Sequence, residues 1–330
     1  MKFQSIFLAM AFVVVLASCR QDEFQKGTVD NLSPFAKSYL GLRNNSSAQG
    51  LAGSSTTMNK SYSDAMVVSG AMPPSGSVTK SDTTIVDVPW YNCATQTDIK
   101  NNDGSITMIT DYGDGCMNGS GEYRYMMWGK SIYTYFNSYT KKGSVVTYEY
   151  RSKSKTINMG GRYYYGQDST SWNSNGSSTY SGHSTYDTAT QTFSGSYAYS
   201  DTSDYTYGNY SYRYRGHGQS SYSQNGSLIS ASDYYYENGD NFYQSTVILP
   251  LFSNYKCYAN ADYSRFCAIL MYVSGRERIH YRQDGKEGTF EIDYGNGECD
   301  NLITIIENGV VVTVDQPTIY ALAAQGAKTY

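Results

Sequence analysis

The chain has little of what several classes of protein need. It has 6 prolines and 3 histidines in 330 residues, only 16% charged residues and a formal net charge of −4. Proteins that bind nucleic acid concentrate Lys and Arg against phosphates, so this balance excludes that class. No stretch reaches 18 consecutive apolar residues, and we therefore expect no transmembrane helix.

Motifs that carry known chemistry are also missing. There is no Gly-x-Ser-x-Gly, no His-Glu-x-x-His and no phosphate-binding glycine loop. No Cys-x-x-Cys pair exists and the histidines are scattered, which argues against a metal centre. His183 and His217 lie among Gly and Ser, and we interpret them as exposed turn residues. We predict a protein that is not an enzyme and has no cofactor and no metal. A glycosidase that uses a pair of carboxylates is the alternative, because the distance between its two acids depends on the fold and not on their spacing in the sequence.

Tyrosine is the residue in excess, with 36 copies beside 31 glycines. It favours strands and carries a large ring under a hydroxyl that tolerates water. Residues 161–243 consist mostly of Tyr, Ser, Gly, Asn, Thr and Asp, and Tyr alternates with small residues at period two. Asn-Gly pairs between such runs favour tight hairpins. We expect these pairs to be turns at Asn175-Gly176, Asn225-Gly226 and Asn238-Gly239.

This pattern predicts a Tyr-rich meander of antiparallel strands, with rows of tyrosine on a face and aromatic pairs between strands. Two other interpretations are open. One is a low-complexity segment that is disordered or assembles into cross-β structure, and the other is a sugar-binding face.

More conventional strand signals flank the Tyr-rich region, and the densest Ile, Val and Leu follow it, so we expect the core there. The fold class is all-β: an antiparallel meander or sandwich-like sheets over residues 84–320, with a C-terminal tail at 321–330. Turns are expected at 102–104, 142–143, 283–285 and 307–309. Strands are expected at 85–90, 105–110, 130–136, 144–151, 246–249, 267–271, 276–281, 288–292, 302–306 and 310–314.

The N-terminus has the features of a secretory signal. Lys2 precedes an apolar run that ends in Leu16-Ala17-Ser18-Cys19, and residues 1–18 are too short for a comfortable membrane span. The tetrapeptide resembles a bacterial lipobox, which implies a palmitoylated, multiply acylated Cys19 and a stable membrane anchor. An ordinary secretion signal is the alternative.

The next four residues, Arg20, Gln21, Asp22 and Glu23, resemble the acidic export signal of Bacteroidota surface lipoproteins. That resemblance implies display outside the cell, with a periplasm-facing lipoprotein as the alternative. Residues 19–83 are expected to be a flexible tether, because 44–81 are rich in Ser, Gly, Asn and Thr. A short helix at 33–42 is expected to interrupt it, with Ser33 as its cap and Pro34 at the first position. The alternative is that this segment wraps on the body as irregular coil.

Five cysteines remain besides Cys19, and an oxidising compartment allows two disulfides. We predict one between Cys93 and Cys116. The other is expected to join Cys299 to either Cys267 or Cys257.

Two similar short sequences occur near the start and near the end of the predicted β-rich body. Asp111-Tyr112-Gly113-Asp114-Gly115-Cys116 is repeated as Asp293-Tyr294-Gly295-Asn296-Gly297-Glu298-Cys299, each after a strand. Calcium binding by these acids is an alternative, but tight turns need Asp, Asn and Gly for backbone reasons alone. With its signature at 288–301, the chain resembles a group of uncharacterised Bacteroidota lipoproteins over 84–120 and 267–315. The resemblance implies an all-β surface or periplasmic lipoprotein and brings no catalytic residues.

Rows of Tyr and Trp on a rigid sheet give a large contact area at low side-chain entropy cost. We therefore predict a surface-exposed outer-membrane lipoprotein that acts as a non-enzymatic interaction or accessory subunit of an outer-membrane protein complex. A glycan-binding lipoprotein that uses Tyr and Trp stacking is the alternative. The candidate binding residues are Tyr197, Tyr199, Tyr205, Tyr207, Tyr210, Tyr212, Tyr214 and Trp172.

Overall fold

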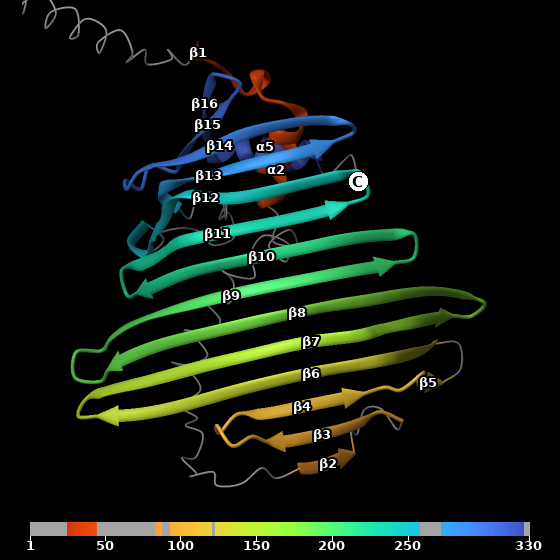
Figure 1. Cartoon of the computed structure of the whole chain (residues 1–330). Coiled ribbons are helices and arrows are strands. Elements are labelled where there is room, and N and C mark those ends of the chain that lie inside the picture. Colours follow the sequence, from red (N-terminus) through yellow and green to blue (C-terminus); the bar gives the residue numbers. More distant parts are fainter. Residues whose placement is uncertain (1–24, 45–82, 88–92, 121–122, 258–271, 327–330) are drawn as a thin grey trace, which may run out of the picture.

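One large antiparallel sheet makes up most of the molecule (Figure 1). The computed structural model describes residues 25–44, 83–87, 93–120, 123–257 and 272–326. Sixteen strands lie in the order β1-β16-β15-β14-β13-β12-β11-β10-β9-β8-β7-β6-β4-β3-β2, and β5 pairs with β6. Neighbours in the chain are therefore neighbours in the sheet from β6 to β16. The predicted meander is confirmed, and the described residues form no second sheet of a sandwich.

Strand length sets the outline of the sheet. The longest strands, β6 to β8, have 20, 21 and 20 residues, or about 65 Å at 3.3 Å per residue. The strands shorten toward the C-terminal end. Their bounds are β1 Gln25–Lys26, β2 Thr83–Asp87, β3 Thr95–Lys100, β4 Ile106–Asp111, β5 Cys116–Ser120, β6 Tyr123–Lys142, β7 Val145–Tyr165, β8 Asp168–Asp187, β9 Thr192–Tyr207, β10 Tyr210–Ser223, β11 Gly226–Asn238, β12 Asn241–Asn254, β13 Tyr272–Gln283, β14 Lys286–Asn296, β15 Leu302–Glu307 and β16 Val310–Asp315.

Local turn chemistry places most of the hairpins. Asp284 and Gly285 both have positive φ, at 52° and 74°, as do Asn308 and Gly309, at 51° and 77°. Two successive residues of positive φ are the requirement of a type I′ hairpin turn. The turns predicted near Asn225-Gly226 and Asn238-Gly239 also join consecutive strands. The turn predicted at Asn175-Gly176 is wrong, because both residues lie inside β8 and are paired with β9.

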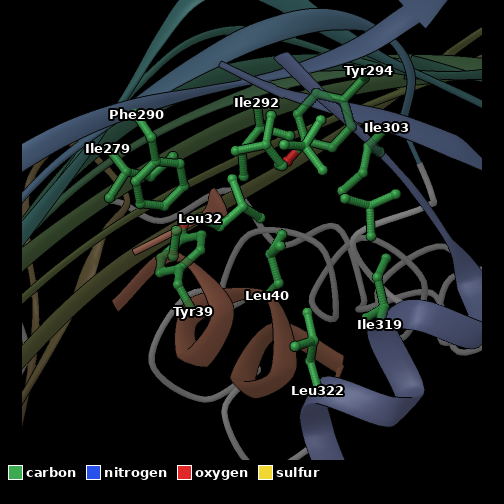
Figure 2. Close-up of a cluster of buried hydrophobic side chains, with 14 of the residues drawn as sticks. Leu32, Tyr39, Leu40, Ile279, Phe290, Ile292, Tyr294, Ile303, Ile319 and Leu322 are labelled. Carbon is green, nitrogen blue, oxygen red and sulfur yellow. The ribbon is translucent and has the colours of Figure 1, made fainter. Parts of the chain in front are cut away.

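Two helices cover one face of the sheet at its C-terminal end. They are α2 (Pro34–Asn44) and α5 (Gln316–Gly326). Figure 2 shows their apolar side chains meeting those of β13 to β15. Burying each of these large side chains contributes roughly 1.5–3 kcal/mol. The core is therefore where the Ile- and Val-rich strands were expected to place it. Fully or nearly fully buried members are Leu32, Tyr39, Leu40, Ile279, Phe290, Ile292, Tyr294, Ile303, Ile305, Val312, Val314, Ile319 and Leu322.

The start of α2 is bound to the sheet by polar contacts. Ser33 Oγ accepts a hydrogen bond from the Ala36 amide (3.1 Å), which confirms Ser33 as the cap of a helix that begins at Pro34. The buried Glu307 carboxylate accepts from the Ser33 amide (2.8 Å) and from the Tyr281 hydroxyl (3.3 Å). Because a buried carboxylate needs such donors, this network specifies where the helix lies.

Two predicted segment boundaries are wrong. Residues 25–44 were assigned to the tether, but they form β1, the short 3-10 helix η1 (Val29–Asn31) and α2 and supply part of the core. The C-terminal tail was expected to begin at 321, yet α5 extends to Gly326 and Leu322 is buried. The Asp315 carboxylate caps α5 by accepting from the Thr318 amide (3.0 Å). The rest of the tether, Cys19 and the export signal lie outside the described residues.

Both predicted disulfide regions are bridged. Cys93 is bonded to Cys116, and Cys257 to Cys299. The first bridge confirms the predicted pair, and the second selects Cys257 as the partner of Cys299. Cys267 lies outside the described residues. No helix in the described part of the chain is long and apolar enough to span a membrane.

Candidate interaction surface

Strand register collects the tyrosines on one face of the sheet. Residues directly opposite on antiparallel strands point to the same side. Trp172 is opposite Tyr207, Tyr207 is opposite Tyr210, and Tyr205 is opposite Tyr212. The same alternation includes Tyr197, Tyr199 and Tyr214. All eight predicted binding residues therefore share the face that also carries α2 and α5, which we call the tyrosine face. The other side is the polar face.

A ladder of ring contacts crosses the tyrosine face from the helices outward. Phe35 and Tyr39 of α2 contact the first ring, Tyr243. Aromatic cross-strand pairs contribute roughly 0.2–1 kcal/mol each, so the ladder stabilises a part of the sheet over which the described residues place no second layer. The successive ring-centroid distances are 5.5 Å for Tyr243–Tyr236, 5.7 Å for Tyr236–Tyr212, 4.8 Å for Tyr212–Tyr205 and 6.1 Å for Tyr205–Trp172.

Glycines make room for these rings. A Cβ atom on Gly218 would lie 2.6 Å from Tyr199 Cε1, and one on Gly216 would lie 2.6 Å from the Tyr214 hydroxyl. The rings therefore lie down over the main chain instead of standing away from the sheet. Tyr197 and Tyr234 are buried beside other rings, Tyr197 stacked on Tyr180 at 5.7 Å and Tyr234 on Tyr243 at 5.5 Å.

The predicted binding residues differ in how far they reach solvent. Tyr197 is only 6% exposed and Tyr199 is half-buried, so both are structural. Tyr205, Tyr212, Tyr214 and Trp172 are half-buried. Tyr207 and Tyr210 are 42% and 70% exposed and lie at the β9–β10 turn.

Three exposed tyrosines of the tyrosine face were not among the predicted binding residues: Tyr186 by the β8–β9 turn, and Tyr163 and Tyr165 at the opposite ends of the strands. Tyr163 and Tyr165 at the end of β7 are 37% and 52% exposed, and their rings are stacked on each other. The charge of an ionised Tyr163 would be felt by Tyr205, which places the two groups in one neighbourhood. The run Tyr163-Tyr164-Tyr165 before Gly166 was the sequence signal for them. We define the exposed aromatic patch as Tyr163, Tyr165, Trp172, Tyr205, Tyr207 and Tyr210.

Electrostatics keep this surface neutral. Burial, followed by the neighbouring phenols, raises the pKa of Tyr205 and of Tyr212. Burial also raises the pKa of Tyr199 and of the Asp201 carboxyl on the same face. The phenols of Tyr199, Tyr205 and Tyr212 therefore stay protonated across the physiological range and present rings and hydroxyls without charge.

The two Asp-Gly loops turn out to be structurally equivalent. Asp111 accepts from the Gly113 amide (2.9 Å) and Asp293 from the Gly295 amide (3.0 Å). Each carboxylate also pairs with a cation on the adjacent strand, Lys130 at 2.8 Å and Arg276 at 2.5 Å. These acids hold tight turns next to the disulfides. Among the residues that the structure describes, no group of three or more His, Cys, Asp or Glu is placed to hold a metal ion.

The two histidines expected in turns are in strands. His183 lies within β8 and His217 within β10, both exposed on the polar face. Gly and Ser around them indicated loops, but Gly216 and Gly218 beside His217 make room for tyrosine rings on the other face.

Comparison with protein-family models, with curated proteins and with solved structures finds no match to this chain.

Proposed function

We propose that this protein is a non-enzymatic, lipid-anchored interaction protein of the outer membrane, facing the cell exterior. In this proposal the exposed aromatic patch docks a partner protein of an outer-membrane complex. The observation that carries it is the concentration of exposed, uncharged rings at one end of the tyrosine face. Tyr and Trp are enriched where protein interfaces bind most strongly.

We propose a protein as the partner because the exposed aromatic patch continues the ring ladder on which α2 already packs inside the molecule. Helix α2 lies on the inner end of the ring ladder, where Phe35 stacks on Tyr281 with centroids 4.1 Å apart. Tyr39 meets Tyr243 edge to face at 5.9 Å. The same ladder continues to Tyr205 and Trp172, beyond the residues that α2 contacts. An apolar, aromatic element of a partner fits the outer end by the same chemistry that holds α2 on the inner end.

The N-terminal sequence supports the proposed location. A lipid on Cys19 holds the protein at a membrane while its folded body remains in water. Only five residues separate Cys19 from Gln25, where the first described element, β1, begins. Such an anchor would therefore be close to the sheet edge formed by β1 and β16. The tyrosine face then extends away from that edge across the sheet.

The proposal that the protein is not an enzyme is supported by the use of its buried acids. Glu277 accepts from Ser245 (3.1 Å) and Tyr294 (2.6 Å), and Glu307 holds the start of α2. These carboxylates satisfy the polar groups around them. Turnover of a polysaccharide that is lost on replacing a single acid would contradict the proposal.

Co-purification tests the docking surface. The lipidated full-length chain, extracted in mild detergent, is expected to bring down a partner in stoichiometric amount. The double variant Tyr207→Ser/Tyr210→Ser is expected to lose it, since removing a hot-spot aromatic costs at least about 2 kcal/mol of binding.

A matched control is available on the same face. Tyr186 is 40% exposed but lies at the opposite ends of the strands, by the β8–β9 turn. Tyr186→Ser is expected to keep the partner. Equal loss in both variants, or a protein that emerges alone and binds neutral glycans through Tyr207 and Tyr210, would refute protein docking at this patch.

A further inference from the structure

The polar face carries many charges, and over β9 to β14 they neutralise each other. Arg213 pairs with Asp204 (3.2 Å) and with Glu237 (3.1 Å). Ion pairs continue along β13 and β14, where Arg278 meets Glu291 at 2.8 Å. Arg282 meets Glu287 at 3.2 Å in the same two strands. Cross-strand placement of opposite charges is thus the rule on this half of the face.

Strand β7 breaks that rule. Arg151, Lys153 and Lys155 are exposed and follow one another at every second position, about 7 Å apart along the strand. None of them has an ion-pair partner among the residues that the structure describes. Arg151 is held in place instead by the Phe136 ring, with its guanidinium 4.5 Å from the ring centroid. The Asp103 carboxylate is close enough to Arg151 to be influenced by its charge, and Glu149 lies two positions before Arg151 on the same strand. Lys153 and Lys155 have no ion-pair partner among the described residues, so they attract an anion from solution.

A hollow of about 410 Å³ opens on the polar face beside this row. It crosses five strands, and its floor is made of small side chains that lie opposite one another in register. Ser181 pairs with Ala198 and His183 with Ser196, while Ser221 lies opposite Ser196 on β10. Arg151 and Glu149 form its end on β7. The hollow therefore offers hydroxyl groups along its floor and a guanidinium at one end.

We propose that this hollow and the adjoining row of Arg151, Lys153 and Lys155 bind an acidic glycan. The serine hydroxyls and the Glu149 carboxylate are suited to sugar hydroxyls, and the cations to carboxylate or sulfate groups. This site is on the opposite face from the exposed aromatic patch, so partner docking and glycan binding do not compete for the same surface.

Other anionic partners fit less well. A nucleic acid would need a series of aromatic rings on which its bases stack, but the hollow is lined mainly by Ser, Ala and Gly, with His183 as the exposed ring among its lining residues. A lipid headgroup surface would need only the cations and would leave the hollow empty. The combination of a hydroxyl-lined hollow with cations at one end fits a ligand that carries both hydroxyl groups and acidic groups.

Binding measurements on the detergent-extracted full chain test this proposal. The probes are chondroitin sulfate and polygalacturonate, each compared with its desulfated or carboxyl-reduced neutral counterpart. We expect the acidic form of at least one to bind more tightly. Lys153→Gln/Lys155→Gln is expected to weaken that binding about tenfold, the loss predicted for one charged hydrogen bond.

Two matched controls distinguish binding at the proposed site from non-specific electrostatic attraction to the protein. Lys141→Gln/Lys142→Gln removes the same charge from the β6–β7 turn and is expected to leave binding unchanged. Ser196→Tyr fills the hollow without changing charge and is expected to abolish binding, whereas Ser200→Tyr, on the same strand and face but outside the hollow, is not. Circular dichroism verifies that all four variants are folded.

Several results would overturn the glycan proposal. These are no binding of either acidic glycan, equal losses in a variant and its control, or binding only to phosphatidylglycerol vesicles. Because Ser196→Tyr leaves Tyr207 and Tyr210 intact, retention of the protein partner in that variant shows whether the two surfaces act separately.

Discussion

Replacing Gly288 by alanine tests whether tyrosine rings lie over the glycines of neighbouring strands. Gly288 on β14 lies directly opposite Tyr281 on β13. A Cβ atom there would lie 2.5 Å from the Tyr281 hydroxyl oxygen and 2.7 Å from Cζ. That ring is 7% exposed and stacked under Phe35, so it has no free space to move into.

The expected cost follows from two effects. Overpacking a well-filled core costs about 1–3 kcal/mol. Moving the Tyr281 hydroxyl away from Ser33 (3.1 Å) and Glu307 (3.3 Å) leaves buried polar groups unpaired, at about 1–3 kcal/mol. Alanine also restricts the unfolded chain, which returns about 0.4–1 kcal/mol. We therefore expect Gly288→Ala to lower the free energy of unfolding by about 2–4 kcal/mol.

Urea unfolding followed by circular dichroism measures this change, with Gly182→Ala as the control. The nearest atom to a Cβ on Gly182 is at 3.4 Å, an ordinary contact, so that variant should be neutral or stabilised by up to about 1 kcal/mol. In a Tyr281→Phe background, Gly288→Ala should cost at least about 0.5 kcal/mol less, because the closest oxygen is gone. If Gly288→Ala behaves like Gly182→Ala, the ring does not lie over this glycine and the reasoning is wrong.

Three further predictions concern titration and covalent links. Burial, followed by the hydrogen bond to Tyr150, raises the pKa of Tyr133 to about 12. The pKa of this phenol in the unfolded chain is 10.0. The neutral phenol therefore stabilises the fold below pH 10, and this contribution is lost as the pH rises toward 12. Phenolate absorbance should therefore lag behind that of the unfolded chain, and coincident titrations would contradict this prediction. Replacing Cys257 and Cys299 by serine removes a link across 42 residues, which the chain-entropy account values at about 4 kcal/mol; an unchanged urea midpoint would argue against it. The hydrogen bond from Lys130 lowers the pKa of Asp111, with the Gly113 amide second, so Lys130→Gln should raise that pKa in a carboxyl titration by NMR. The Asp111–Lys130 pair stabilises the fold above about pH 4 and loses that effect on acidification. The free energies of unfolding of wild type and variant should therefore converge in acid. A constant difference between them at all pH values would refute the assignment.

Local sequence signals predicted a large part of the fold. The type I′ turns at Asp284-Gly285 and Asn308-Gly309 depend on residues that tolerate positive φ, a property of those residues alone. Asn175-Gly176 also consists of Asn and Gly but lies within β8, where both residues pair with β9 and Gly176 pairs with Thr156 of β7 as well. Helix α5 was missed although Asp315 and Pro317 are start signals, since its apolar stretch is short and lies at the end of the chain.

The candidate surface was predicted less completely than the fold. Alternation indicated which tyrosines share a face, and the eight predicted binding residues do share one, although they are spread along the strands. It did not indicate that Tyr197 would be buried while Tyr210 is 70% exposed. Exposure depends on which glycine or ring the neighbouring strand places beneath each tyrosine, and that is a matter of register between strands.

By itself the sequence determined the strand character of the Tyr-rich region, two of its turns, the cap of α2 and the regions joined by disulfides. All of these depend on residues close together in the chain or on the chemistry of single residue types. The tertiary structure alone decided which side of the sheet the helices cover, which rings remain exposed and where unpaired cations adjoin a hollow. Those features arise from contacts between residues far apart in the chain, and a one-dimensional pattern does not contain the register that brings them together.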